Sequence, residues 1–127
     1  MEKKVVGWFE IPVEDMDRAV KFYSTVFGYD MQRNPVGPLD MALFMSIDEG
    51  IGAAGALVKH PDFYKPSQEG TLVYFIAKSG DLSNELAKVE AAGGKIFVPK
   101  TPISEEVGYM AVFYDTEGNR VAMHSKK

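Results

Sequence analysis

Two residues of the sequence combine acid–base chemistry with a place on a strand-like segment. Glu10 lies two positions after Trp8, and His124 lies two positions after Ala122. Since side chains alternate between the two faces of a strand, each titratable residue shares a face with that neighbour. A carboxylate and an imidazole on converging strands can form a charge-assisted pair or act as an acid–base couple. Glu10 and His124 are therefore candidate catalytic residues.

The composition of the 127-residue chain excludes several classes of chemistry. There is no cysteine, which rules out disulfides, thiolate metal sites and thiol nucleophiles. The net charge of −4 argues against a nucleic-acid partner, because phosphates require a basic surface. No apolar run approaches the ~20 residues of a membrane span, and Met1–Lys4 leads into a strand-like stretch rather than a signal peptide. We therefore expect a cytoplasmic protein that binds neither nucleic acid nor membrane.

The residue pattern up to Lys59 predicts the element order β-α-β-β-β. Val5–Ile11 alternates and ends at Pro12, which favours a strand. From Asp15 onward, apolar residues recur every three or four positions until Gly28, which predicts an amphipathic helix with a cap at each end. Turn-forming residues separate three further strand-like runs. These runs are Tyr29–Arg33, Met41–Ile47 and Gly52–Lys59.

The same order begins again after residues 60–70, a segment with two prolines, a glycine and several polar residues. The elements predicted in the second half are a strand, a helix and three strands, at Thr71–Ala77, Asp81–Ala92, Lys95–Val98, Gly108–Tyr114 and Arg120–His124. One offset of 66 positions (74 minus 8) places Trp8 on Tyr74 and Asp15 on Asp81. Two copies of one supersecondary unit explain these coincidences together.

The repeat predicts an α+β fold within a single domain, residues 1–127. Each half, residues 1–59 and 71–127, would leave an apolar sheet face uncovered by itself. Residues 60–70 form the predicted linker between the halves. Because pairing the half-sheets buries both apolar faces, we expect the two halves to pack together.

Short motifs point to a known family. Residues 13–15 (VED) end the first strand, residues 18–23 (RAVKFY) lie in the helix, and residues 27–28 (FG) follow it. Residues 115–119 (DTEGN) form a turn before the last strand. Together they resemble the vicinal oxygen chelate family, also called the glyoxalase/bleomycin-resistance/dioxygenase family, over essentially the whole chain. The resemblance implies two tandem βαβββ modules whose half-sheets form a curved, barrel-like, eight-stranded cavity with the helices outside.

Metal-dependent members of this family hold the ion with His, Glu or Gln side chains, one from the first and one from the fourth strand of each half. The resemblance and the offset place these positions at Trp8 and Tyr74, and at Ala56 (with Gly55 as the neighbouring register) and Ala122. Trp, Ala and Gly offer no ligand, and a Tyr phenol rarely binds a divalent ion alone. We therefore expect neither the family's metal site nor a cofactor.

The first functional hypothesis is a metal-free binding or resistance-type protein. Large aromatic residues opposite small ones leave a concave space with flat apolar walls, which suits a planar or apolar small molecule. The residues expected to bind this ligand are Trp8, Tyr74, Ala54, Ala56 and Ala122.

The second hypothesis is a lyase or isomerase of the glyoxalase type, with Glu10 and His124 as acid–base groups or as unusual metal ligands. The resemblance does not decide between the two hypotheses, because the family includes lyases, isomerases, epimerases, dioxygenases and antibiotic-binding proteins. A structural interpretation also stays open, in which both side chains bond water or backbone at the open end of the fold. A third hypothesis is a partner surface around Phe63 and Tyr64. The resemblance further implies a homodimer, with modules paired within one chain or between chains.

Three other features receive a structural interpretation. The glycine-rich run 50–55 leads into a strand and lacks the following helix of a phosphate-binding loop. Glu105 and Glu106 fall in a predicted loop and are expected to be solvated. His60, next to Pro61, is expected at the surface.

Overall fold

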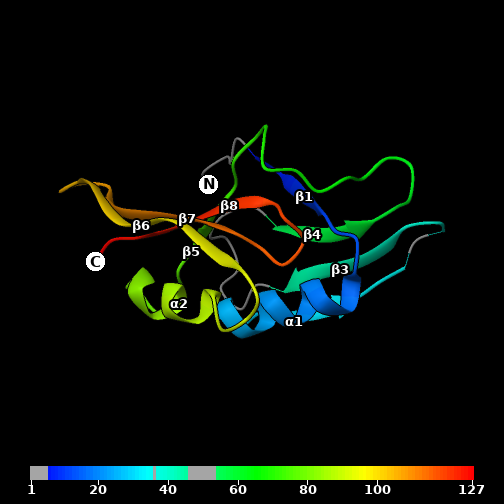
Figure 1. Cartoon of the computed structure of the whole chain (residues 1–127), viewed down its shortest axis with the longest axis horizontal. Coiled ribbons are helices and arrows are strands. Elements are labelled where there is room, and N and C mark those ends of the chain that lie inside the picture. The colour runs from blue at the N-terminus through cyan, green and yellow to red at the C-terminus, as the bar shows by residue number, and fades with distance from the viewer. Residues whose placement is uncertain (1–5, 36, 46–53) are drawn as a thin grey trace.

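The computed structural model describes residues 6–35, 37–45 and 54–127, with two sheets above a layer of two helices (Figure 1). The first half contains β1 (Trp8–Pro12), α1 (Met16–Phe27), β2 (Asp30–Arg33), β3 (Asp40–Met45) and β4 (Ala54–Lys59). The second half contains β5 (Tyr74–Ile76), α2 (Leu82–Val89), β6 (Lys95–Ser104), β7 (Gly108–Tyr114) and β8 (Arg120–Ser125). The order βαβββ is therefore present twice.

Each half forms a four-stranded sheet with the same arrangement of strands. The strand orders are β1-β4-β3-β2 and β5-β8-β7-β6. In both sheets the first strand runs parallel to the fourth, and the other neighbours are antiparallel. The predicted α+β fold of two tandem βαβββ modules is thereby confirmed. Within residues 6–35, 37–45 and 54–127 no strand pairing joins the two sheets, so they form an open arrangement rather than a closed barrel.

Each helix begins at an aspartate. The Asp15 carboxylate accepts a hydrogen bond from the backbone N–H of Arg18, and the Asp81 carboxylate accepts one from that of Ser83. These bonds satisfy amide groups that a helix N-terminus would otherwise leave free. Gly28 ends α1 in the left-handed conformation, with φ of 72°. The predicted caps of the first helix are therefore confirmed.

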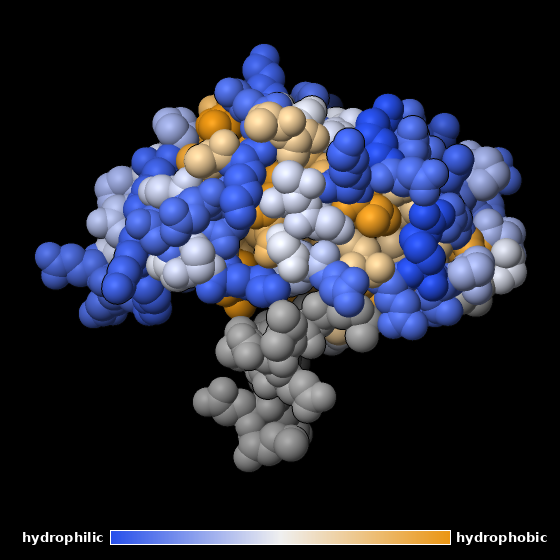
Figure 2. All heavy atoms as spheres, turned by 90° about the horizontal axis from the view of Figure 1, so that it is seen from below, coloured by the Kyte–Doolittle hydropathy of each residue, from blue (hydrophilic) through white to orange (hydrophobic). Residues whose placement is uncertain are grey.

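Both helices turn their apolar sides toward the sheets. Seen from below, on the side of the helices, the molecular surface is mostly hydrophilic, with smaller apolar areas between the polar side chains (Figure 2). The buried residues of each helix recur at the three- and four-residue spacing expected of an amphipathic helix. Among the described residues, no helix has the length and apolar character needed to cross a membrane.

One aromatic cluster joins the two halves between helices and sheets. The ring of Phe75, on β5, lies with its centroid 5.5 Å from that of Tyr23 and 4.8 Å from that of Phe27, both on α1. It also packs against Phe9 of β1 and Phe44 of β3, at 5.8 and 5.2 Å. Aromatic rings bury large apolar areas. The helix-facing sides of the two sheets therefore share one core.

Strand β6 continues past its predicted end at Val98 to Ser104, although Pro99 and Pro102 lie in that stretch. Proline cannot donate to a strand ladder, but an edge strand needs donors on one side only. β6 is the edge of its sheet and pairs with β7 through a ladder that is interrupted by register shifts. The two prolines are therefore compatible with a strand that extends beyond the predicted Lys95–Val98.

Two elements are shorter than predicted. Strand β5 covers residues 74–76 of the expected 71–77, although the Ala122 N–H still donates to the Val73 carbonyl at 2.9 Å. Helix α2 ends at Val89, because the Gly94 N–H closes a turn onto the Val89 carbonyl at 2.9 Å. The predicted strand residues 46, 47, 52 and 53, residue 5 and most of the glycine-rich run 50–55 lie outside the described residues.

The offset of 66 holds for the first strands and the helix caps but fails at the fourth strands. Trp8 pairs with Ala54 in β4, whereas Tyr74 pairs with Ala122 in β8. The chain between paired residues spans 46 positions in the first half (54 minus 8) and 48 in the second (122 minus 74). The sheet register therefore equates Ala54, not Ala56, with Ala122. A two-residue shift keeps the same face of the strand, so an alanine occupies the position in either register.

Candidate ligand-binding site

Each sheet has one face turned away from the helices, and we call these the first face and the second face. The first face carries Trp8, Glu10, Met41, Leu43, Ala54, Ala56 and Val58, and the second carries Tyr74, Ile76, Met110, Val112, Ala122 and His124. All the candidate site residues therefore lie on these faces. Trp8 and Tyr74, at the start of β1 and β5, are 44% and 48% exposed.

The Glu10 carboxylate is held by two aromatic side chains on the first face. The Tyr64 hydroxyl donates to Glu10 Oε1 at 2.6 Å, and the Trp8 indole Nε1–H donates to Oε2 at 3.3 Å. The hydrogen bond to Glu10 raises the pKa of Tyr64, so its hydroxyl stays protonated and keeps donating. Glu10 itself is exposed. Both carboxylate oxygens are thus oriented by neutral donors.

Tyr64, from the linker, also covers part of the first face. Its ring packs against a small apolar cluster formed by Met41, Ala56 and Val58. A β-bridge between His60 and Tyr64 holds this part of the linker. Ala56 has no exposed surface as a result, whereas Ala54 is exposed. Of the two alanines expected to bind ligand on this face, only Ala54 is accessible.

The second face has a different environment. Tyr74 and Ile76 are exposed, while Ala122 has no exposed surface. His124 Nε2 lies 2.5 Å from the Val107 carbonyl, so this ring nitrogen carries the proton and donates to the backbone. The His124 imidazole therefore connects β8 to the loop between β6 and β7.

The two candidate acid–base residues have separate partners. Glu10 is bonded to Trp8 and Tyr64 on the first sheet, and His124 is bonded to Val107 on the second. Across the described parts of the chain, no hydrogen bond connects Glu10 with His124. Their action as an acid–base couple remains a prediction.

The residues at the family's metal positions do not fit a metal ion. Trp8 and Tyr74 present an indole and a phenol, and Ala54, Ala56 and Ala122 present methyl groups. A divalent ion requires several imidazole, thiolate or carboxylate ligands together. In residues 6–35, 37–45 and 54–127 no group of three or more His, Cys, Asp or Glu side chains is placed to hold an ion.

A cleft of about 210 Å³ lies beside Glu10, between the end of β1, the linker and the start of β8. Its lining is formed by Glu10, Ile11, Pro12, Lys65, Ser67, Glu69, Thr71, Val73, Asn119, Arg120 and Val121. Lys65 and Arg120 contribute positive charge and the two glutamates negative charge. Arg120 Nη2 donates to the Gly70 carbonyl at 2.9 Å, which fastens the linker to β8. The cleft therefore gives the first face a polar border of mixed charge.

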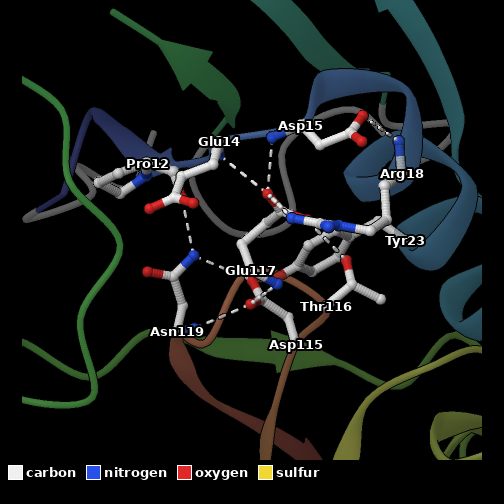
Figure 3. A network of polar contacts seen from close by, with 9 residues as sticks. All are labelled: Pro12, Glu14, Asp15, Arg18, Tyr23, Asp115, Thr116, Glu117 and Asn119. Carbon is white, nitrogen blue, oxygen red and sulfur yellow. Dashed lines mark hydrogen bonds and ion pairs between the residues drawn. The ribbon is translucent and has the colours of Figure 1, made fainter. Parts of the chain in front are cut away.

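A polar network links the turn before β8 to the start of α1 (Figure 3). Glu117 Oε1 accepts hydrogen bonds from the backbone N–H groups of Glu14 and Asp15, both at 2.8 Å, and Arg18 Nε donates to Oε2 at 2.6 Å. The carboxylate thus lies at the positive end of the helix and in an ion pair. Burial alone would raise the pKa of Glu117, but Arg18 and the backbone donors outweigh it, and the pKa is lowered.

Asp115 forms the inner end of this network. Its carboxylate accepts hydrogen bonds from the Tyr23 hydroxyl at 2.7 Å and the Asn119 amide at 3.0 Å. Burial raises the pKa of Asp115, and burial together with Asp115 raises the pKa of Tyr23 well above its usual range. Asn119 also donates to the Pro12 carbonyl at 2.7 Å. The turn of the second half thereby fastens both β1 and α1 of the first.

The sequence interpretation identified residues 115–119 only as a turn and missed this network. The partners are 99 positions apart for Arg18 and Glu117, and 92 apart for Tyr23 and Asp115. Spacing patterns within one sequence report on neighbours along an element, not on such distant pairs. The sequence offered one hint of the network: these four residues lie within the two motifs that resemble the family, residues 18–23 and 115–119.

A family model described as "Bleomycin resistance protein-like N-terminal" matches residues 6–45, which extend from β1 to β3. A "Glyoxylase-like domain-containing protein" of Didymella fabae is 28% identical over 121 residues, which cover 93% of this chain and 91% of that protein. Both similarities fall on the same family that the sequence motifs resemble.

Several solved structures share the fold at low sequence identity. A glyoxylase/bleomycin resistance protein/dioxygenase domain from a Frankia species has a TM-score of 0.74 at 15% identity, covering 99% of this chain and 100% of that one. TnmS3, an antibiotic binding protein from a Streptomyces species, has a TM-score of 0.66 at 21% identity, covering 100% and 99%. A mutant of glyoxalase I from Zea mays has a TM-score of 0.69 at 19% identity over 94% of this chain. This chain spans only 46% of that maize protein.

Three kinds of observation now agree. The motif residues 13–28 extend from the end of β1 through α1, and residues 115–119 form the turn between β7 and β8, as predicted. The βαβββ unit occurs twice with one strand order. The matching family model and the relative from Didymella fabae both carry names from the glyoxalase and bleomycin-resistance group. These findings support the resemblance of the chain to the glyoxalase/bleomycin-resistance/dioxygenase superfamily, the vicinal oxygen chelate family, whose fold it shares.

Proposed function

We propose that the protein binds a small planar or apolar molecule on its helix-free faces without the metal ion of its metal-dependent relatives. The observation that carries this proposal is the exposure of Trp8 and Tyr74, at 44% and 48%, on equivalent positions of the two sheets. Large exposed aromatic side chains beside alanines offer flat apolar contact area. The antibiotic-binding description of TnmS3, which shares the fold, agrees with a binding role.

Intrinsic fluorescence can test the proposal, because Trp8 is the only tryptophan of the chain. We expect 2-naphthol, a planar probe, to change this fluorescence saturably, and cyclohexanol, a non-planar control, to leave it unchanged. Calorimetry on Trp8→Ala and Tyr74→Ala should show weakened binding of 2-naphthol. Equal responses to both alcohols, or full binding by both variants, would count against the proposal.

The metal-free part of the proposal has its own test. The protein, purified without chelator, should contain no stoichiometric metal, and dialysis against EDTA should leave 2-naphthol binding unchanged. Tightly bound zinc, nickel, manganese or iron at one ion per chain would overturn this part.

An enzyme of the lyase or isomerase type is the second candidate. It is favoured by the presence of two titratable side chains, Glu10 and His124, on the helix-free faces. Turnover of a glyoxalase-type substrate should then fall by about 10²-fold or more in Glu10→Gln and in His124→Gln. Turnover that both variants retain would remove this candidate.

We further propose that residues 1–127 act as one cytoplasmic domain that forms a homodimer. Apolar side chains on the second half support an interface, since Ile76, Phe97, Ile103 and Val107 are 44–55% exposed. Large exposed apolar patches are typical of such contacts. Sedimentation should give a dimer, and Phe97→Glu should shift it toward monomer. A monomer at all protein concentrations would contradict the proposal.

A further inference from the structure

The Glu10 carboxylate has unused hydrogen-bonding capacity on both oxygens. An ionised carboxylate has about four acceptor sites, two on each oxygen. Tyr64 takes one on Oε1 at 2.6 Å, and Trp8 takes one on Oε2 at 3.3 Å. Among the described residues no other donor contacts this carboxylate, so one site is left on each oxygen. Two adjacent acceptors of this kind match a planar ligand group that presents two parallel N–H donors.

The charge of this carboxylate also lacks a counterion. Both of its donors, a phenol and an indole, are neutral. Among the described residues, no lysine or arginine lies within ion-pair distance of Glu10, although Lys65 and Arg120 line the cleft beside it. A cationic ligand would therefore gain a charge-assisted hydrogen bond that no side chain in the described part of the chain makes.

An apolar surface for the rest of such a ligand lies next to the carboxylate. Trp8 is 44% exposed, and Ala54, its partner on β4, is also exposed. The second face lacks the carboxylate, because Ile76 occupies the position of Glu10 there. A preference for cations is therefore expected of the first face alone.

We propose that the first face binds a planar ligand with an amidinium-like cation, whose paired N–H groups donate to Glu10 Oε1 and Oε2 while its plane contacts Trp8. This inference rests on the proposed binding function and names the chemical class of the ligand. Tyr64 is a positioning residue in this site, because it orients Glu10.

Three probes of one shape test the proposal: benzamidine, which is cationic at neutral pH, neutral benzamide and anionic benzoate. Titrations followed by Trp8 fluorescence should show benzamidine binding about fivefold to tenfold more tightly than benzamide, with benzoate the weakest. Raising the salt concentration should weaken benzamidine binding and leave benzamide binding unchanged. This salt test uses the unaltered protein.

Matched variants locate the effect. In Glu10→Gln, the preference for benzamidine over benzamide should fall below about twofold, because the charge is lost while the side-chain shape is kept. Glu69→Gln removes a carboxylate from the same cleft and should retain the preference. In Tyr64→Phe, the preference should decrease but persist.

The outcomes separate this inference from the proposed function. Equal affinity for benzamidine and benzamide would overturn the cation preference and leave planar binding intact. Tighter binding of benzoate would also overturn it, and would indicate that Lys65 and Arg120 dominate. An absence of response to all three probes, together with no response to 2-naphthol, would overturn both.

Discussion

The first and second faces come from two copies of one unit, yet their surfaces differ. On the first face, Tyr64 from the linker covers Ala56 and Val58 and holds the Glu10 carboxylate. On the second, Tyr74 and Ile76 are exposed, and His124 donates to the backbone of its own hairpin. The helix-facing sides are alike in role, since both pack into one aromatic core. The copies thus diverge on their helix-free faces and remain similar where they support each other.

This difference has a physical basis. A residue in the shared core contacts many others, so a change in volume there costs packing energy. A residue on an exposed face contacts few others, and its replacement usually changes stability by less than about 0.5 kcal/mol. The exposed residues of the two faces can therefore differ without loss of the fold.

The largest effect is expected where the two halves meet. Phe75→Ala should lower the free energy of unfolding by about 3–5 kcal/mol, because Phe75, on β5 of the second half, packs against aromatic rings of the first half. Urea denaturation measures this change. Phe63→Ala is the control, since Phe63 is 81% exposed, and its cost should stay within about 0.5 kcal/mol. Similar costs for both variants would contradict a shared core.

The junction network should give the next largest effect. Glu117→Ala leaves Arg18 and two backbone amides just before α1 without their acceptor, and should cost about 2–4 kcal/mol of unfolding free energy. The lower part of this range is expected, because the half-exposed Arg18 guanidinium can form hydrogen bonds with water once Glu117 is removed. The control is Glu105→Ala, in the exposed hairpin turn, with a change near zero. A mild effect of Glu117→Ala would show that the turn does not fasten α1.

The pH dependence of stability separates the charge of Glu117 from its shape. The folded-state pKa of Glu117 is lowered, so its stabilising contribution is fully present above its unfolded-state pKa of about 4.3. That contribution is lost as the pH falls through the folded-state pKa. The stability difference between the unaltered protein and Glu117→Gln should be about 1 kcal/mol at pH 7 and shrink toward zero in acid. A constant difference would contradict this role of the charge.

The smallest effect compares a tyrosine from each environment. Tyr64→Phe removes the hydrogen bond to Glu10 and should lower the melting temperature slightly. The matched change on the second face, Tyr74→Phe, should cost nearly nothing, because Tyr74 is exposed and its hydroxyl makes no hydrogen bond within the described residues. Thermal denaturation of both variants distinguishes them. An equal change in stability for both variants would contradict a difference between the environments of Tyr64 and Tyr74.

Much of the fold could be predicted because it depends on local pattern. The three- and four-residue spacing after Asp15 predicted α1, and the recurrence of Asp at position 81 predicted the second helix. The residue types at Trp8 and Tyr74 indicated exposed aromatic positions in place of metal ligands. Strand length was less predictable: β6 continues through Pro99 because it lies at a sheet edge, which its own sequence does not encode.

The candidate site was predicted only in part. Its faces followed from strand alternation, and Glu10 was identified on that basis. The linker residue Tyr64 was considered as part of a partner surface, and its contact with Glu10 depends on how the linker crosses the sheet. The register of β4 also depends on tertiary pairing, which equates Ala54 with Ala122.

The sequence by itself determined the doubled βαβββ order, the helix caps and the residue types at the family's metal positions. These features depend on composition and on spacing within about twenty residues of one element. The tertiary structure alone decided that Tyr64 covers one face, that Glu117 holds the start of α1, and that Glu10 and His124 have separate partners. The reason is physical: such contacts join residues 17 to 103 positions apart, so their geometry arises only when separate elements of the chain pack together.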